Sequence, residues 1–159
     1  MPKITALIHS HDCTDALRLA RALDSLRPCD QVVVVDHGQS AEVQRVCREH
    51  GATVKTAITG VSPGAYLMDA RNDWILCLLP NESLTEALEA SLLEWKNNEH
   101  DPAETYGAAI RAEDASGWHS LPPETRLVNR NTVNWTGDLP PSTAKSKVLE
   151  GELLRFASP

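Results

Sequence analysis

Short apolar runs alternate with amphipathic segments through residues 1–98, and this order constrains the fold more than any other feature. Gln31–Val35 contains four successive valines, which is typical of a strand covered on both faces of a parallel sheet. Because strands that alternate with helices usually pair in parallel, we expect an α/β fold, with helices on both faces of a mostly parallel central sheet. The strands are expected at Ile4–Ile8, Gln31–Val35, Thr53–Ala57 and Trp74–Leu79. The helices are expected at Thr14–Leu26, between a Ser40 cap and Gly51, at Ala65–Ala70, and after a capping box that begins at Ser83.

The character of the sequence changes after Asn98. Tyr106–Ala112 and Trp118–Leu121 predict a hairpin that turns around residues 114–117, and Pro122 and Pro123 are expected to interrupt it. A second hairpin is expected from Arg126–Arg130 and Thr132–Trp135, turning at Asn131. The tail, Ser142–Phe156, is expected to form a helix with one apolar side made of Val148, Leu149, Leu153 and Phe156.

Composition and charge exclude several classes of protein. The chain has 159 residues, 42% of them hydrophobic, which is enough for one substantial core and predicts a single domain over 1–159. The formal net charge of −7, with scattered Lys and Arg, argues against a nucleic-acid partner. No apolar stretch approaches the roughly 20 residues that span a bilayer, and the N-terminus does not resemble a signal peptide. We therefore expect a cytoplasmic protein, with Cys13, Cys29, Cys47 and Cys77 reduced.

The stretch Asn72–Glu82 indicates where a site would lie. It contains the apolar run Trp74–Leu79, which ends abruptly at Pro80 and continues as a polar turn, Asn81 and Glu82. Ligands of parallel α/β sheets bind at the carboxyl ends of the strands. Asp12, Asp36 and Asn81 each follow or end an expected strand, so we expect them to converge at one edge of the sheet.

Five segments together resemble a family 2 glycosyltransferase, an inverting nucleotide-diphospho-sugar enzyme of the GT-A fold, and most closely the bacterial branch that modifies lipopolysaccharide cores. The segments, spread over residues 3–140, are ITALIHSHD, VVVVDHGQS, HGATV, DWILCLLPNE and RLVNRNTVNWTG. The resemblance implies a GT-A-like, Rossmann-type sandwich with a nucleotide-binding-like half at 1–98, acceptor-side hairpins at 99–141 and a tail at 142–159. It also implies nucleotide-binding roles for Asp12, Asp36, Gly38 and Asn81, with Asp36 at the position that pairs with a uracil base.

The departures from this family concern the catalytic groups. Leu79 and Asn81 stand where the family has the two aspartates of its metal-binding D-x-D motif, and Pro140 and Pro141 stand where it has a His-Glu pair. Ala41 replaces a further acidic residue, and the segment 65–67 lacks the expected cationic residue near the diphosphate. A departing nucleoside diphosphate needs a divalent cation or several cationic groups, so each electrostatic part of the mechanism is weakened.

Three hypotheses on function follow. The leading one is a catalytically degenerate glycosyltransferase-like protein with a weak pocket for a nucleotide or nucleotide sugar and no cofactor. The first alternative is an active transferase with an atypical acid, Asp12, Glu82 or Asp138, using Mn²⁺ or Mg²⁺ held by Asn81 and Glu82. The second alternative is a structural or regulatory partner of a true transferase, docking through the apolar side of the tail, or a homo-oligomer.

Seven side chains have both a binding and a structural interpretation. His9, His11, Cys13 and His37 are zinc ligands by type, but their spacing favours the polar lining of a cleft. Asp36 could pair with a base or cap the loop that follows it. Trp118 and Trp135 could stack on a sugar, although packing of a hairpin on the core is the favoured interpretation.

Overall fold

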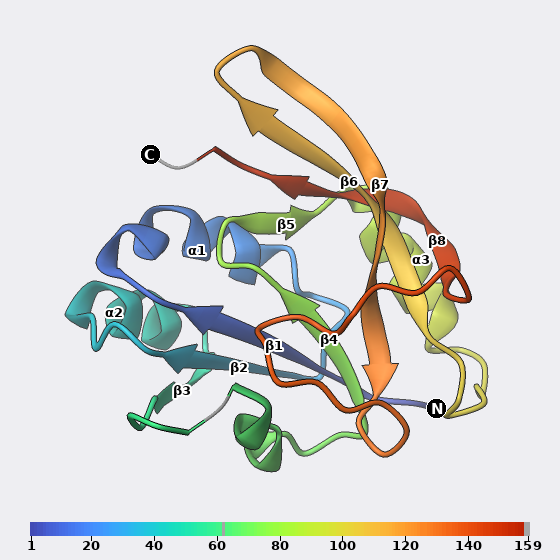
Figure 1. The fold of residues 1–159 in the computed structure, drawn as a ribbon, viewed down its shortest axis with the longest axis horizontal. Coiled ribbons are helices and arrows are strands. Elements are labelled where there is room, and N and C mark those ends of the chain that lie inside the picture. Colours follow the sequence, from blue (N-terminus) through green and yellow to red (C-terminus); the bar gives the residue numbers. More distant parts are fainter. Residues whose placement is uncertain (62, 158–159) are drawn as a thin grey trace.

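A computed structural model describes residues 1–61 and 63–157, with the side chains of 63–65 left out of the description. Eight strands form one sheet in the order β3-β2-β1-β4-β7-β6-β8-β5 (Figure 1). The strands are β1 Ile4–Ser10, β2 Gln31–Asp36, β3 Thr53–Thr56, β4 Trp74–Leu78, β5 Glu82–Leu84, β6 Tyr106–Asp114, β7 Gly117–Asn129 and β8 Lys147–Arg155. The helices are α1 Ala16–Asp24, α2 Ala41–Glu49 and α3 Glu86–Trp95, with 3-10 helices η1 Cys13–Asp15 and η2 Pro63–Asp69. The α/β class is therefore confirmed.

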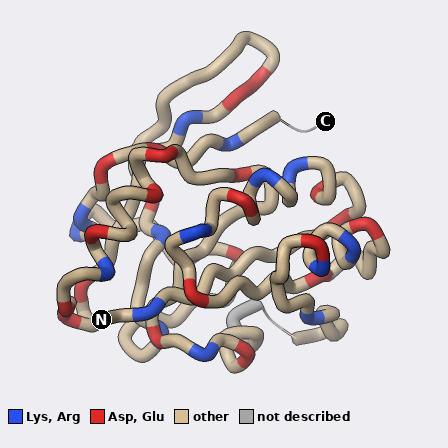
Figure 2. The backbone as a smooth tube through the Cα atoms, turned by 180° about the vertical axis from the view of Figure 1, so that it is seen from behind, with Lys and Arg blue, Asp and Glu red and all other residues tan. Residues whose placement is uncertain are grey.

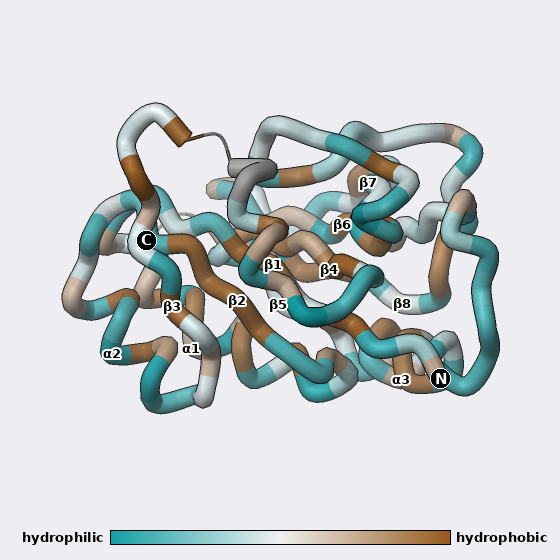
Figure 3. The backbone as a smooth tube through the Cα atoms, turned by 90° about the horizontal axis from the view of Figure 1, so that it is seen from below, coloured by the Kyte–Doolittle hydropathy of each residue, from teal (hydrophilic) through white to brown (hydrophobic). Residues whose placement is uncertain are grey.

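The first four strands pair in parallel, as the alternating pattern predicts. β1 lies between β2 and β4, and β3 pairs with the far side of β2. Successive valines point to opposite faces: Val34 packs into one apolar cluster, and Val33 and Val35 pack into the other. Figure 3 shows the same strands as the hydrophobic centre of the molecule, with hydrophilic loops around them. Burial on both faces explains why these runs are uniformly apolar.

The two faces of the sheet are covered differently. The cluster on one face takes its side chains from α1, α2 and α3, including Leu19, Val43 and Leu92. The cluster on the other face is closed by Tyr66 and Ala70 of the η2 region and by Trp135 of the loop after β7. The three α-helices thus cover one face, and the 3-10 helix η2 and a loop cover the other.

Most element boundaries in residues 1–98 lie within one or two residues of the predicted ones. Ser40 caps α2 as expected, with its hydroxyl accepting a hydrogen bond from the Val43 N–H at 3.3 Å. The predicted capping box at Ser83 is wrong, because Ser83 lies in β5, paired with Leu154 of β8. Thr85 caps α3 instead, through a 3.3 Å bond from the Leu88 N–H.

The sheet is mixed because the strands after Asn98 are mainly antiparallel. β7 pairs antiparallel with β4 and β6, and β8 pairs parallel with β6 and antiparallel with β5. The predicted first hairpin is present as β6 and β7, and it extends beyond the rest of the sheet in Figure 1. The prediction that Pro122 and Pro123 interrupt it is wrong. They lie at a register shift between Ala108 and Ile110 of β6, a bulge where the missing proline N–H groups cost little.

The predicted second hairpin is also wrong. Its first arm is the carboxyl end of β7, where Leu127 and Asn129 pair with β4. Its second arm is not a strand, because the N–H groups of Thr132 and Val133 both donate to the Asn129 carbonyl, each at 3.1 Å, in a turn. The chain then crosses the second face of the sheet as the loop that carries Trp135.

The tail forms the strand β8, not the predicted helix. Gly151 has φ +99°, and a Cβ atom there would clash with the backbone N of Leu88, so the strand passes close against α3. Leu153 is fully buried and Phe156 nearly so. Two members of the expected docking stripe, Leu153 and Phe156, are therefore part of this chain's own core, whereas Leu149 is partly buried and Val148 is 55% exposed.

Charges of both signs are interspersed along the backbone (Figure 2). Within the described part of the chain, no helix is long and apolar enough to cross a membrane.

Candidate functional site

A cleft of about 210 Å³ opens at the carboxyl ends of β1 and β4. The residues after β1, the start of α1, the turn after β4 and one loop residue, Asp138, form its walls. The lining consists of His9, His11, Asp12, Thr14, Asp15, Arg18, Leu79, Pro80, Asn81 and Asp138. Two of the expected residues, Asp12 and Asn81, therefore meet in one cleft.

Asp12 ends β1's extended conformation and starts the helical turn η1. Its carboxylate accepts hydrogen bonds from the N–H of Thr14, at 2.8 Å, and from the Thr14 hydroxyl. These bonds stabilise the ionised form and lower the pKa of Asp12 below its ordinary value. Asp15 reciprocates by accepting from the N–H of Asp12 at 3.3 Å, and it also accepts from the N–H of His11 at 2.8 Å. The turn is thus fixed by two carboxylates, both of which line the cleft.

Asp36 lies at the end of β2, beside Ser10 at the end of β1, and is fully buried. One carboxylate oxygen accepts from the Ser40 N–H at 2.9 Å and from the Gln44 side-chain amide at 3.2 Å, so Asp36 caps the loop before α2. The other oxygen is buried without a partner. Gly38 passes close to β1's end, because a side chain there would meet the His11 carbonyl at 2.9 Å.

The turn after β4 sends its two polar side chains in different directions. Asn81 lines the cleft, and its amide donates to the Phe156 carbonyl at 2.8 Å. Glu82 is fully buried on the other side. Its carboxylate accepts from the Arg126 guanidinium at 2.8 Å and from the Arg155 guanidinium at 3.0 Å. Both oxygens of Glu82 are engaged by cationic groups, which leaves Asn81 and the apolar Leu79 facing the cleft.

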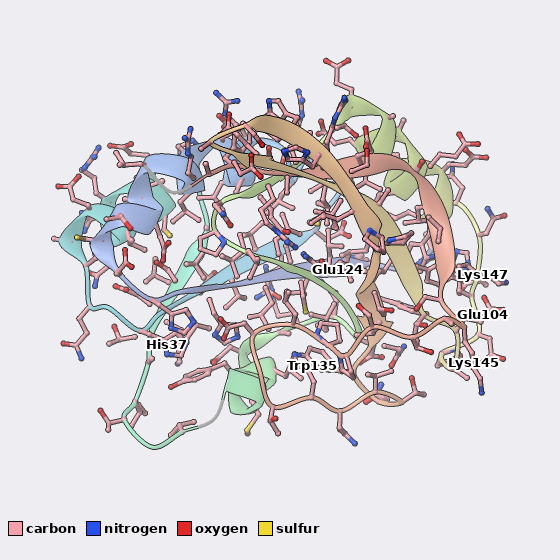
Figure 4. All side chains as sticks on the ribbon, turned by 45° about the horizontal axis from the view of Figure 1, so that its top comes forward. His37, Glu104, Glu124, Trp135, Lys145 and Lys147 are labelled. Atoms are coloured by element: carbon pink, nitrogen blue, oxygen red, sulfur yellow. The ribbon has the colours of Figure 1, made fainter. Side chains whose placement is uncertain are left out.

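Three imidazoles form a contiguous group, the histidine cluster, made of His9, His11 and His37. His9 Nδ1 lies 2.8 Å from His37 Nε2, and the rings of His11 and His37 stack with centroids 4.5 Å apart. Asp138 accepts a hydrogen bond from His11 Nε2 at 2.6 Å. Tyr66 packs edge-on against His9 and His37 from the η2 side, the side on which Figure 4 also shows Trp135. The prediction that these histidines line a cleft is confirmed for His9 and His11.

Burial decides the protonation state of the inner imidazoles. His9 is 1% exposed and its Nε2 has no partner. Burial lowers the pKa of His9 to about 4, against the opposing charge of Asp138 and with help from His37 and His11. The pKa of His37 is lowered as well, first by burial and then by His11. His9 and His37, the two inner imidazoles of the cluster, are therefore neutral near pH 7.

This pKa predicts acid sensitivity of the fold. The folded-state pKa of His9 lies below the ordinary value of 6.5, so protons bind the unfolded chain more tightly. The stability contributed by neutral His9 is complete above pH 6.5 and is lost as the pH falls toward 4, by about 3 kcal/mol. Urea unfolding of the unmodified chain and of His9→Gln between pH 7.5 and 4.5 measures the difference. We expect the two stabilities to converge on acidification, whereas His119→Gln, on the exposed hairpin, should follow the unmodified chain. Parallel curves for His9→Gln would contradict the assignment.

A metal site is not assembled in this cleft. Among residues 1–61 and 63–157, no group of three or more His, Cys, Asp or Glu is placed to hold a metal ion. His9 and His37 direct nitrogens at each other, and Cys13 is an exposed free thiol. Trp135 is 7% exposed and packs in the second apolar cluster, as expected. Trp118 is 40% exposed and packs edge-on against Phe156.

Sequence reasoning missed one cationic residue of the cleft, Arg18. It projects from the first turn of α1, and its guanidinium lies 5.2 Å from the centroid of the Phe156 ring. Its Nε is buried without a partner. From the sequence alone, an arginine at this position of a helix is expected to be a solvated surface residue. Its place in the cleft depends on Phe156, which follows β8 and packs against its guanidinium. Arg18 provides the positive charge in a lining that otherwise holds three carboxylates.

Comparisons with known proteins agree with this architecture. No family model and no curated protein matches the sequence. Solved structures that match include a mycobacterial protein, with TM-score 0.53 and 15% identity over 71% of this chain and 42% of that chain. Another is glucosyl-3-phosphoglycerate synthase of Mycobacterium tuberculosis, with TM-score 0.51 and 14% identity over 69% of this chain and 45% of that chain. This chain spans less than half the length of either protein, and the likeness establishes a shared GT-A-type fold.

Proposed function

We propose that this chain is a glycosyltransferase-like protein that has lost metal-dependent sugar transfer and keeps a weak pocket for a nucleotide or nucleotide sugar. The pocket is the cleft at the ends of β1 and β4, which Asp12 and Asn81 line. Asp36 and Gly38, beside the end of β1, are the other nucleotide-side residues of the proposal. The lipopolysaccharide-core branch remains part of this proposal on the strength of the sequence motifs alone.

The observation that carries the proposal is the turn after β4. A metal-dependent enzyme needs carboxylates here to hold a cation against a diphosphate. In this chain Leu79 and Asn81 face the cleft, and the carboxylate next to them in sequence, Glu82, is buried between Arg126 and Arg155. Asn81 presents a neutral amide that is already bonded to Phe156. None of these groups supplies a charged metal ligand to the cleft.

The fold supports a nucleotide as the ligand class. The synthase of Mycobacterium tuberculosis, at 14% identity, has been crystallised with Mn²⁺, uridine diphosphate and glucosyl-3-phosphoglycerate. In this chain, Asp36 keeps one buried oxygen without a partner at the end of β2, which suits a nucleobase N–H. Arg18 lines the cleft and supplies its positive charge, so a phosphate bound there would meet this side chain. We place the acceptor side in residues 99–141, which bring Asp138 to the same cleft.

A second candidate function is an active transferase with an atypical base, and one contact favours it. His11 donates from Nε2 to Asp138 at 2.6 Å, so its Nδ1 is the nitrogen left to accept a proton. In such an enzyme His11 would take the proton of an acceptor hydroxyl, and Asp138 would hold the imidazole in place. Asp12 would take part only by fixing the turn η1.

Calorimetric titration with UDP-glucose, with and without Mn²⁺, tests the leading proposal. We expect binding no tighter than about 0.1 mM, or about −5.5 kcal/mol, because one arginine replaces a cation and its ligands. Mn²⁺ should leave the affinity unchanged. Arg18→Gln should weaken binding, whereas Arg45→Gln, on the exposed side of α2, should not. Micromolar, Mn²⁺-dependent binding would refute the proposal.

A cytoplasmic location is proposed on cysteine usage. All four cysteines are free, and burial raises the pKa of the Cys77 thiol to about 12, which keeps it unreactive.

A further inference from the structure

The fixed charges of the cleft do not suit the ligand that the fold suggests. Asp12, Asp15 and Asp138 line it together with one arginine, Arg18. With neutral imidazoles, these groups sum to a charge of about −2, by ordinary ionisation at pH 7. A pyrophosphate diester carries two further negative charges, and their mutual repulsion is strong in a partly enclosed site. Positive charge must come from elsewhere for such a ligand to bind.

The histidine cluster can supply positive charge because two of its imidazoles line the cleft. His9 and His11 line the cleft directly, and His37 contacts both of them. His9 is nine-tenths buried or more, and its Nε2 has no partner in the protein. The cluster is faced by Asp138 from the loop after β7, by Tyr66 from η2 and by Asp36 from β2. Asp15 and Asp12 face the adjoining cleft from η1, and Arg18 faces it from α1.

We propose that the histidine cluster takes up protons when a pyrophosphate diester occupies the cleft, so that imidazolium supplies the positive charge that a metal ion supplies in metal-dependent enzymes. This inference rests on the proposed function. The lowered pKa of His37 means that the cluster holds unoccupied proton sites near pH 7.5, and a bound dianion favours filling them. Asp138, 2.6 Å from His11 Nε2, is the carboxylate placed to stabilise an imidazolium in this cluster.

Linkage gives the size of the effect. If binding takes up about one proton, the dissociation constant falls by up to about tenfold for each unit by which the pH is lowered through the titration range. The cleft would then bind its ligand more tightly below neutral pH than above it, and no metal would be required. A site that relied on Arg18 alone would show no such dependence, because arginine stays charged throughout.

Calorimetry with UDP-glucose is the test, because this ligand has no group that titrates between pH 6 and 8. Titrations at one pH in two buffers of different ionisation enthalpy give the number of protons taken up. We expect net uptake in the unmodified chain and in His119→Gln, and loss of uptake in His11→Gln and His37→Gln.

The outcomes separate the two proposals. Binding whose heat is the same in both buffers, or uptake that survives in both cluster variants, overturns the proton linkage and leaves the proposed function standing. Absence of binding at every pH from 6 to 8 refutes the proposed function, and the linkage with it. The comparison of two buffers on the unmodified chain already shows whether binding takes up protons. The proton linkage can therefore be refuted even if a cluster variant folds poorly.

Discussion

Arg126→Met is expected to lower the free energy of unfolding by about 3–5 kcal/mol, because it leaves a buried carboxylate short of its main partner. Arg126 is 1% exposed and binds both oxygens of Glu82, which is fully buried. It also donates to Glu124 at 2.9 Å and to the Cys77 carbonyl at 3.2 Å. Arg155 remains on Glu82 at 3.0 Å, but it is itself partly exposed and cannot replace two bonds.

Urea unfolding at pH 7 measures this effect. Arg45→Met is the matched control, since Arg45 pairs with Glu42 and Glu49 on the exposed side of α2, and its loss should cost less than about 1 kcal/mol. The double variant Glu82→Leu with Arg126→Met should recover part of the loss, because it removes the unpaired charge along with its partner. A loss below 1 kcal/mol for Arg126→Met would show that the network is open to solvent.

The parallel half of the fold could be predicted because its signals are local. Valine runs, the Ser40 cap and Gly51 each act through neighbouring residues, and β1, β2 and β4 appear where their apolar runs lie. Thr85, not Ser83, caps α3 because Ser83 lies in β5 and pairs with Leu154 of β8, which is 71 positions later in the sequence. No local pattern carries that information.

The strands after Asn98 could not be predicted for the same reason. Residues Arg126 to Asn129 became the end of β7 because β4 offered an open edge, and the tail became β8 because β6 and β5 did. One further sequence feature indicates a long-range contact. Arg126 lies next to the apolar residues Leu127 and Val128, and Glu82 follows the apolar run Trp74–Leu79. Two opposite charges in such positions are expensive to bury alone, so their pairing could have been proposed from the sequence.

The sequence predicted that Asp12 and Asn81 lie near each other, but it did not predict the contacts of the residues around them. Strand order brings Asp12 and Asn81 to one cleft, as the carboxyl ends of parallel strands require. The pairing of His11 with Asp138 joins residues 127 positions apart, and it depends on how the loop after β7 crosses the sheet. The sequence analysis singled out both residues separately, but their hydrogen bond follows only from the fold.

The double variant Leu79→Asp with Asn81→Asp is expected to gain Mn²⁺ affinity by at least about tenfold, or 1.4 kcal/mol, while sugar transfer stays at background. Both positions line the cleft, so the new carboxylates would face each other across Pro80, where a hard cation prefers oxygen ligands. Transfer should not follow, because the positions of the family's His-Glu pair hold Pro140 and Pro141. Loss of a single well-placed electrostatic group costs about 10²–10³ in rate, and here several are missing together.

Mn²⁺ titration followed by paramagnetic resonance, and release of uridine diphosphate from UDP-glucose, measure the two halves of this expectation. Asn81→Asp alone controls for loss of the 2.8 Å bond to the Phe156 carbonyl, and Leu79→Asn alone controls for added polarity without charge. The decisive arm is the unmodified chain in the release assay. Clear turnover there, abolished by Asp12→Ala or Asp138→Asn, would mean that the cleft holds an altered catalytic site, with the His11–Asp138 pair as its proton acceptor if Asp138→Asn is the variant that fails.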